Sequence, residues 1–457
     1  MLTLNIDHRA TLFPLEVQVH QQLVEQIARR LTFENPQWAE NEKRGFSNFD
    51  TPECICGYEL SGDQLIVPRG FARQLVGILR GAGVQFKLDD QRRTLAPVNF
   101  TFTGQLRDFQ VEAVGVMAAR DFGVLAAPTG SGKTVVALEL IARRQQPALI
   151  VVHTKELLEQ WVDRIEKFLG IPAREVGIIG NGKKRIGEKI SVALVQSLYK
   201  CAGEVAPHIG HLVVDECHRC PSRTFLEAVT AFDCRYMTGL SATPWRRDQL
   251  SRLIWWHLGD KVHEVDAATL VEAGHVLQAD VIWRETSFEP IHDPSEEYSR
   301  MLSELTQDPE RNGLIADDVA QEAQGEALGV CLVLSDRVAH CRTLVNLLEA
   351  RGVSAAMLTG DLPAADRRKV VEALNAGEVR VLAATGQLIG EGFDCRDLST
   401  LFLATPIRFN GRLLQYLGRV PRPAPGKEKA RVFDYVDIQV GVLENAARVR
   451  RSVYEHS

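Results

Sequence analysis

The stretch Gly123-Val124-Leu125-Ala126-Ala127-Pro128-Thr129-Gly130-Ser131-Gly132-Lys133-Thr134 decides how this chain folds. It begins as a short apolar strand, turns through two glycines, and runs into a helical pattern at residues 135–143. Glycines let the backbone of such a turn point its N–H groups inward, and the N-terminus of the following helix adds partial positive charge. A strand, this glycine-rich turn and a helix in direct succession predict a phosphate-binding loop.

The loop also indicates which side chains hold a nucleoside triphosphate. Lys133 is expected to reach the β- and γ-phosphates, and the Thr134 hydroxyl is expected to ligate Mg²⁺. ATP and Mg²⁺ are therefore the expected substrate and cofactor. The other loop residues predicted to bind the nucleotide are Thr129, Gly130, Ser131 and Gly132.

A second apolar strand, at residues 211–215, ends in two adjacent carboxylates, Asp215 and Glu216. Asp215 is expected to hold Mg²⁺, and Glu216 to polarise the attacking water. Two acids after a strand are commonly just a solvated edge. The phosphate-binding loop upstream favours the catalytic interpretation here.

From Gly104 onward, short apolar strands alternate with amphipathic helices, which is typical of a parallel sheet covered on both faces. The first series of expected strands is 123–127, 148–153, 190–195, 211–215 and 236–240. The second series is 330–334, 355–358, 379–383, 400–404 and 430–434. The polar segment 290–326 between them predicts a connection and a leading helix. We therefore expect an α/β chain with two doubly wound parallel-sheet lobes, at residues 101–285 and 286–457.

Residues 1–100 show a different pattern and are expected to form a small α+β accessory domain. The expected elements are a strand at 2–6, a helix within 17–31, a polar loop at 35–48, a strand at 64–67 and a helix at 71–80.

The bulk composition limits the class of protein. Apolar residues make up 45% and charged residues 25%, as in soluble globular proteins. No apolar run is long enough for a membrane span and the N-terminus lacks a signal-peptide pattern, so a cytoplasmic protein without membrane contact is expected. The nine scattered cysteines suit reduced thiols. The net charge of −6 argues only against a non-specific coating of nucleic acid.

Arg419 and Arg422 lie three residues apart in a helical pattern, hence on one helical face. Such arginines can reach a γ-phosphate and stabilise the charge that develops during phosphoryl transfer. Basic helices are more often solvated, so this assignment depends on the other motifs. Pro421 disturbs the helix before Arg422, which favours Arg419 of the two.

Together these residues resemble helicase superfamily 2, over most of residues 104–437. The resemblance implies two RecA-like lobes and roles for further residues. Arg107 and Gln110 are similar to the segment that reads adenine, and Gly392 and Asp394 to the motif that touches both strand and nucleotide. The residues implied to contact nucleic acid or couple it to ATP are Thr154, Gln196, Ser241, Thr243, Ser335, Thr359, Gly360, Thr385 and Gln415.

Details point to a branch of the superfamily. DEAD-box RNA helicases carry Ala and Asp where this chain has Cys217 and His218. The segment 418–422 and the pair Arg311-Asn312 are similar to the xeroderma pigmentosum type B and phage UvsW group. That group acts on DNA, so the resemblance implies an ATP-dependent motor that unwinds or remodels single-stranded, duplex or branched DNA.

Several alternatives stay open. The chain could be a duplex translocase that separates no strands and serves a nuclease, repair or defence partner. It could be a nucleotide-gated sensor with little turnover, or an RNA helicase. Residues 1–100 could read DNA structure, or serve only docking or stability. The cations at 183–185, after the turn Asn181-Gly182, could touch phosphate or form a solvated loop.

Overall fold

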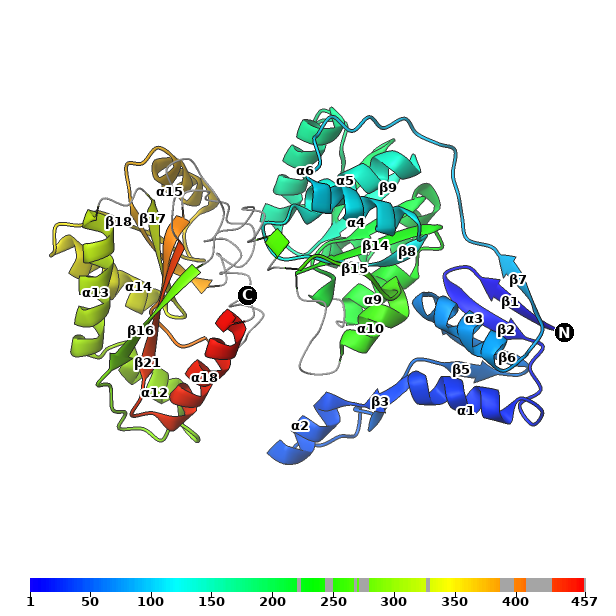
Figure 1. Ribbon diagram of the computed structural model, residues 1–457, viewed down its shortest axis with the longest axis horizontal. Helices are drawn as coiled ribbons and strands as arrows, with labels where there is room; N and C mark the ends of the chain where they lie inside the picture. Colours follow the sequence, from blue (N-terminus) through cyan, green and yellow to red (C-terminus); the bar gives the residue numbers. More distant parts are fainter. Residues whose placement is uncertain are drawn as a thin grey trace. The chain divides into compact units, whose positions relative to one another are not determined.

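The computed structural model describes residues 1–219, 223–242, 250–266, 269–270, 279–325, 329–386, 398–407 and 430–455 (Figure 1). The chain separates into two compact units. The first comprises Met1–Ala127 and Gly132–Val265, and the second consists mainly of Asp266–Ser457. Within the described part of the chain, we find no helix that is both long enough and apolar enough to cross a membrane.

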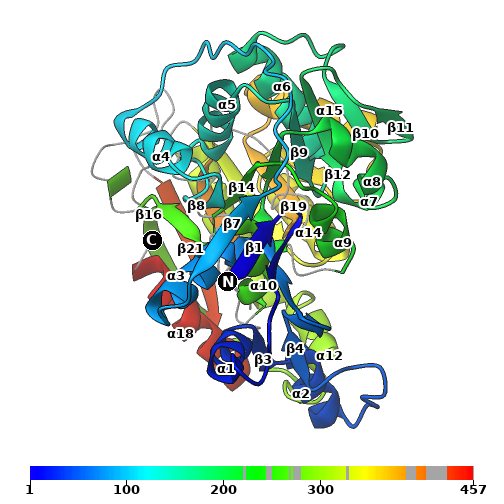
Figure 2. The ribbon, with the colours of Figure 1, turned by 90° about the vertical axis from the view of Figure 1, so that its right-hand side faces the viewer.

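The N-terminal domain is built on a five-stranded sheet, in which only the β1–β7 pair is parallel. Its order is β5 (Glu59–Ser61), β6 (Gln64–Pro68), β2 (Arg9–Phe13), β1 (Leu2–Ile6) and β7 (Phe86–Asp90). Alternate residues of β1, Leu2, Leu4 and Ile6, face a core that α1 (Gln21–Arg30) and α3 (Ala72–Gly81) close (Figure 2). The sequence predicted β1, β6 and the two helices, but not β2, β5 or β7.

One prediction in this domain is wrong. Residues 35–48 were expected to form a loop, yet they contain the helix α2 (Pro36–Arg44) between β3 (Thr32–Glu34) and β4 (Cys54–Cys56). Asn35 caps its first turn, Pro36 occupies the start, and Gly45 ends it in the left-handed conformation. These are ordinary helix boundary signals, but the segment has few apolar residues, so its helical periodicity is weak.

The eight-stranded sheet of the first lobe contains all five strands predicted there. Its order is β11 (Lys183–Arg185), β10 (Gly177–Gly180), β12 (Ile190–Leu194), β9 (Ala148–Val152), β13 (His211–Val214), β14 (Tyr236–Ser241), β8 (Phe122–Ala126) and β15 (Lys261–Glu264). Every neighbouring pair is parallel except β10–β11. The helices α4 (Asp108–Ala118), α5 (Lys133–Arg144) and α6 (Lys155–Leu169) cover one face (Figure 1). The helices α7 (Val195–Leu198), α8 (Ala202–Val205), α9 (Arg223–Thr230) and α10 (Ser251–Leu258) close the core on the other.

The N-terminal domain docks on α10 within this same unit. Trp256 lies in the N-terminal core and contacts the Phe33 ring edge-on. The backbone of Gly70 passes so close that a Cβ atom there would lie 2.5 Å from the Trp255 carbonyl oxygen. The buried Arg69 donates to the carbonyl of Cys234 at 2.8 Å. The accessory domain and the first lobe therefore share one continuous packed interface.

The second lobe has a six-stranded, all-parallel sheet. Its order is β16 (Ala279–Thr286), β21 (Ala430–Asp437), β20 (Leu398–Leu403), β17 (Val330–Ser335), β19 (Val381–Thr385) and β18 (Ala355–Leu358). The helices α13 (Pro309–Gln324) and α14 (Val338–Glu349) close one core, and α15 (Ala364–Asn375) and α18 (Gly441–Glu455) close the other. A further helix, α12 (Tyr298–Leu305), packs with Val440 and Leu443.

The junction between the lobes differs from the sequence expectation. Strand β16 pairs along its whole length with β21, so it belongs to the second sheet. A boundary between residues 285 and 286 would leave this strand with the first lobe. The polar segment 290–326 contains two helices, α12 and α13, rather than one.

Candidate functional site

The phosphate-binding loop lies between β8 and α5, as the sequence predicts. Gly130 and Gly132 adopt φ of 89° and 82°, a region open to glycine but strained for other residues. A Cβ atom on Gly132 would also lie 2.5 Å from the side-chain nitrogen of Gln110. Gly132 is therefore required by both its conformation and its neighbour.

Four predicted side chains lie in this loop or directly after it. The Lys133 ammonium donates to the carbonyl of Ala127 at 2.9 Å, which keeps the cation over the turn. Thr134 is the second residue of α5 and is half-buried. Ser131 is buried, and the Thr129 hydroxyl oxygen is shielded from solvent.

Helix α4 brings the predicted adenine-reading residues to the loop. The buried Gln110 accepts a hydrogen bond from the backbone N–H of Arg107 at 3.0 Å, which holds the amide at the start of the helix. The same amide lies against Gly132. Arg107 itself is exposed. The structure thus brings Gln110 to the phosphate-binding loop from a separate helix.

Asp215 directly follows β13 and is buried, with two donors on its carboxylate. The indole N–H of Trp161 donates to Oδ2 at 2.8 Å, and the Glu216 N–H donates to Oδ1 at 2.9 Å. Burial and the neighbouring negative charge of Glu216 raise the pKa of Asp215 to about 6, while Trp161 and Lys133 counteract this rise. A carboxylate and a hydroxyl oxygen are donors that suit Mg²⁺, so Asp215 and Thr134 fit the predicted metal.

Glu216 has φ of 49°, a left-handed conformation that a non-glycine residue adopts at an energetic cost. Such strain is common where a side chain must be aimed for chemistry. The Glu216 carboxylate lies 3.3 Å from Nδ1 of His218, and the same nitrogen lies 3.1 Å from the Ser241 hydroxyl. The carbonyl of Ser241 accepts from the N–H of Ala127 at 2.9 Å. His218 thus joins the predicted water-polarising acid to the predicted coupling residue Ser241.

The sequence places Trp161 at the end of the stretch 153–161, which resembles a motif that grips the nucleic-acid strand, and it assigns no role to His218. His218 lies two residues after Glu216, so its position in the motif was a usable signal. The Trp161–Asp215 contact spans two separate elements, and no local pattern indicates it.

The residues of the first lobe that are predicted to contact a nucleic-acid strand lie at one edge of the β-sheet. Thr154 caps α6 by accepting from the N–H of Leu157 at 3.3 Å, and Gln196 is exposed in α7. Their strands β9 and β12 are neighbours, and Val152 pairs with Leu194 at the carboxyl ends. Asn181 and Gly182 form the predicted tight turn beyond the next strand, β10, with positive φ at both residues. Beyond this turn, Lys184 forms an ion pair with Glu204.

Four predicted residues of the second lobe also meet at a carboxyl edge. Ser335 pairs with Thr385 at the ends of β17 and β19, and Thr359 and Gly360 follow the adjacent β18. Thr359 is buried and Gly360 is exposed. The buried Ser335 hydroxyl bonds to Nδ1 of His340 at 2.9 Å, so its side chain serves the interior of the lobe. A contact between Ser335 and nucleic acid stays a prediction.

Six predicted site residues lie outside the described residues, so their roles stay predictions. They are Thr243, Gly392, Asp394, Gln415, Arg419 and Arg422. Within the described residues, no group of three or more His, Cys, Asp or Glu side chains is arranged to hold a metal ion.

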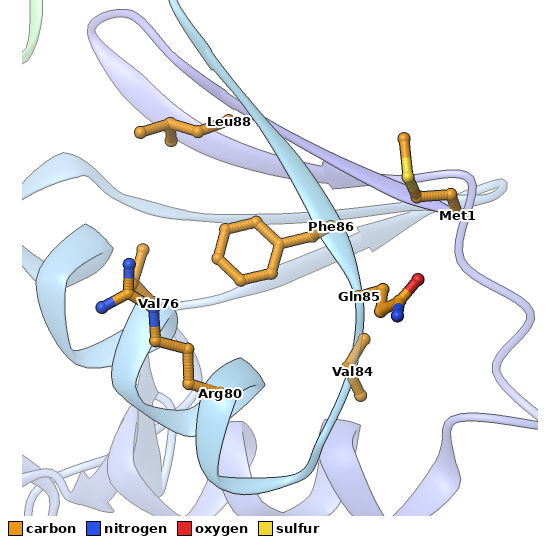
Figure 3. Close-up of a pocket in the computed structure, with 7 residues that line it drawn as sticks. All are labelled: Met1, Val76, Arg80, Val84, Gln85, Phe86 and Leu88. Atoms are coloured by element: carbon orange, nitrogen blue, oxygen red, sulfur yellow. The ribbon is translucent and has the colours of Figure 1, made fainter.

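A hollow of about 480 Å³ lies on the N-terminal domain (Figure 3). Val76 and Arg80 of α3 and Phe86 and Leu88 of β7 line it, together with Met1, Val84 and Gln85. Its one charged side chain, Arg80, offers no acid–base pair.

Comparisons with known proteins show which proteins this chain is similar to. Residues 103–246 match the family described as "Type III restriction enzyme, res subunit", and residues 315–424 match the "Helicase conserved C-terminal domain". A probable helicase D10 of Escherichia phage T5 is 28% identical over 383 residues, which cover 83% of this chain and 82% of that protein. The DNA 3'-5' translocase XPB2 of Sulfurisphaera tokodaii is 38% identical over 144 residues, 32% of each chain.

Among solved structures, the Pyrococcus furiosus Hef helicase domain matches 75% of this chain and 98% of its own, with a TM-score of 0.53. At 14% identity this likeness shows the fold alone. The two helicase-type family matches cover the two parallel-sheet lobes in the order that the motifs predicted. The chain therefore belongs to helicase superfamily 2 and is an ATP-hydrolysing helicase.

Proposed function

We propose that the first lobe hydrolyses ATP with Mg²⁺, and that the chain uses this energy to unwind or remodel duplex or branched DNA. The observation that carries the proposal is the meeting of three groups at one sheet edge. Lys133 begins α5 directly after the loop that follows β8, and Asp215 and Glu216 follow β13. The electrostatic influence of Lys133 on Asp215 supports their assignment to one site.

Each residue then has a defined task. The loop amides and Lys133 would bind the phosphates, and Gln110 would orient the base from its place beside Gly132. Asp215 and Thr134 would hold Mg²⁺, which supplies positive charge to the phosphate oxygens when bound. Glu216 would accept a proton from the attacking water and so act as the general base.

The contacts with a nucleic-acid strand would come from other residues at the same carboxyl edge of the first lobe's sheet. Thr154 and Gln196 follow β9 and β12. Strand β9 lies beside β13 in the sheet, and β12 lies on the other side of β9. Nucleotide and nucleic acid would therefore bind adjacent strand ends of one rigid sheet. Gripping the backbone rather than the bases implies little sequence preference and a strong dependence on salt.

The relative XPB2, which is named a DNA 3'-5' translocase, favours DNA as the substrate. A relative from Acanthamoeba polyphaga mimivirus, 25% identical over 78% of this chain, is named a putative ATP-dependent RNA helicase, so the experiment below includes RNA. A second candidate function is a duplex translocase that separates no strands. The match of residues 103–246 to a restriction-enzyme subunit favours this candidate. It would act beside a nuclease, repair or defence partner.

We propose further that residues 1–100 read DNA structure. Their most exposed aromatic side chains are Phe46 and Phe49, 62% and 94% exposed in the loop after α2. The buried Asn41 stabilises this loop through the side chain of Asn48 at 2.9 Å. Exposed aromatic rings on an ordered loop can stack on unpaired bases. Deleting the domain would expose Trp256, so the double substitution of Phe46 and Phe49 by Ser is the cleaner test.

The deciding experiment is steady-state ATP hydrolysis with no nucleic acid, single-stranded DNA, duplex DNA, forked DNA and RNA. Glu216→Gln serves as the inactive control. Stimulation by DNA, greatest on forks and absent with RNA, is the expected result. A rate that ignores every nucleic acid would instead favour the nucleotide-gated sensor. Stimulation by duplex without strand separation in a parallel unwinding assay would favour the translocase, and stimulation by RNA alone an RNA helicase.

A further inference from the structure

Helix α6 connects two parts of the proposed motor. Its N-cap is Thr154, a predicted strand contact, and Trp161 lies two turns further along. Seven residues of α-helix span about 10 Å and return to nearly the same face. Thr154 and Trp161 therefore lie on one side of a single rigid element.

Trp161 is one of the most completely buried large side chains of the described chain, with 1% of its surface exposed. Its indole nitrogen donates to Oδ2 of Asp215 at 2.8 Å. The other carboxylate oxygen, Oδ1, accepts from the backbone N–H of Glu216. One hydrogen-bond donor to the Asp215 carboxylate thus belongs to the residue after Asp215, and the other belongs to α6.

A tryptophan at position 161 brings a polar N–H group into the interior of the lobe. A buried position on α6 could be filled by Phe or Leu, whose side chains have no polar atom that requires a hydrogen-bond partner. A buried indole N–H requires an acceptor, and here the acceptor is the predicted metal ligand. A hydrogen bond to a metal-binding carboxylate fixes its orientation, and loss of such a partner typically reduces metal affinity or activity about 10- to 100-fold.

We propose that Trp161 is a positioning residue that orients Asp215, and that α6 transmits strand binding at Thr154 to the metal site through this indole. The inference rests on the proposed function of both ends. A strand bound at the N-terminus of α6 shifts the helix, the indole moves with it, and the Asp215 carboxylate turns. DNA binding then changes how well the site holds its metal without any direct contact between the two.

The test compares Trp161→Phe with Trp256→Phe. The first removes the N–H donor and retains an aromatic ring, and the second makes the same change at a buried tryptophan of the N-terminal core. Mn²⁺ binding to the full chain with ADP, followed by electron paramagnetic resonance, reports the metal site without turnover. Trp161→Phe is expected to weaken Mn²⁺ binding about 10-fold and to lower the stimulation of hydrolysis by single-stranded DNA. Trp256→Phe is expected to change neither.

A second measurement uses the unsubstituted protein and does not depend on how well a variant folds. In protein labelled with ¹⁵N-tryptophan, the six indole resonances are resolved, and single-stranded DNA is added without nucleotide. A shift of the Trp161 resonance is expected, because α6 moves relative to Asp215. If Trp161→Phe folds, the resonance that is missing from its spectrum is that of Trp161. If it does not fold, the wild-type resonance that Mn²⁺ with ADP broadens selectively is assigned to Trp161.

Wild-type Mn²⁺ affinity in folded Trp161→Phe would overturn the positioning role. An unchanged Trp161 resonance on adding DNA, or unchanged DNA stimulation in Trp161→Phe, would overturn transmission through α6. Lys133→Ala distinguishes these failures from failure of the proposed function. If Lys133→Ala hydrolyses ATP at the wild-type rate, the assigned site itself is wrong. If Lys133→Ala is inactive and Trp161→Phe behaves like Trp256→Phe, only the inference about Trp161 fails.

Discussion

The imidazole of His218 lies between two groups of different function, 3.1 Å from the hydroxyl of Ser241 and 3.3 Å from the carboxylate of Glu216. Ser241 ends β14, and its carbonyl accepts from Ala127, the last residue before the phosphate-binding turn. One imidazole therefore connects the acid expected to polarise water with the strand that supports the phosphate loop. This arrangement determines what loss of the Ser241 hydroxyl should do.

Ser241→Ala is expected to reduce the coupling between DNA binding and hydrolysis. Without the hydroxyl, His218 loses its contact with Ser241, so its position no longer follows β14. We expect basal hydrolysis within about threefold of wild type, as the loss of one hydrogen bond implies. DNA stimulation should fall more strongly. The ratio of rates with and without single-stranded DNA measures this, and an unchanged ratio would contradict a coupling role for His218.

Glu216→Gln should abolish hydrolysis and leave ATP binding almost intact. The amide has the same shape but cannot accept a proton from water, and general-base catalysis contributes about 100- to 10,000-fold. Hydrolysis and equilibrium binding of a fluorescent ATP analogue would be measured together. Glu204→Gln is the matched control, because Glu204 is an exposed acid paired with Lys184. A Glu216→Gln protein that turns over normally would refute the assignment of the base.

Gly70→Ala should destabilise the docking of the N-terminal domain. The added Cβ would meet three backbone atoms of α10 and its C-terminal turn at 2.5 to 2.6 Å, and such overpacking costs about 1–3 kcal/mol. Gly77→Ala is the control, since a Cβ there meets nothing within 4 Å in the middle of α3. It should stabilise by about 0.5–1 kcal/mol through helix propensity. Urea denaturation of both variants tests this, and equal midpoints would exclude tight docking at Gly70.

Acidification should destabilise the second lobe through His340. Burial, and to a smaller extent the charge of Arg311, lower the pKa of His340 to about 3. Its Nε2 contacts the side-chain oxygen of Asn312 at 2.8 Å, and its Nδ1 contacts Ser335. The unfolded chain binds the proton more tightly, so this stabilising contribution is present above pH 6.5 and decreases as pH falls towards 3.

At pH 5 the contribution of His340 to the free energy of unfolding is expected to be about 2 kcal/mol smaller than at pH 7. Denaturation of wild type and His340→Gln at both pH values measures it. The His340→Gln variant is less stable at pH 7. Between pH 7 and pH 5, however, its free energy of unfolding should decrease by about 2 kcal/mol less than that of wild type. His208→Gln, at an exposed position, should follow wild type. Parallel pH profiles for wild type and His340→Gln would show that His340 titrates normally.

Local signals were sufficient for much of this molecule. The phosphate-binding turn, its flanking strand and helix, and the acidic pair after β13 were all predicted from contiguous residues, because adjacent positions set the backbone conformation there. The ten strands predicted in the two lobes were found with small shifts at their ends. The exception among local predictions is α2, whose boundary residues Asn35, Pro36 and Gly45 were clear, but whose apolar periodicity was too weak to indicate a helix.

The sequence by itself determined the repeating strand–helix order, the identity of the phosphate-binding loop and the chemistry expected beside it. Only the tertiary structure decided that β7 pairs with β1, that β16 joins the second sheet, that Gln110 lies on Gly132 and that Trp161 donates to Asp215. The physical reason is the range of the interactions. Turn conformation and helix starts depend on neighbours a few residues away, whereas these four contacts form only when separate elements pack against each other.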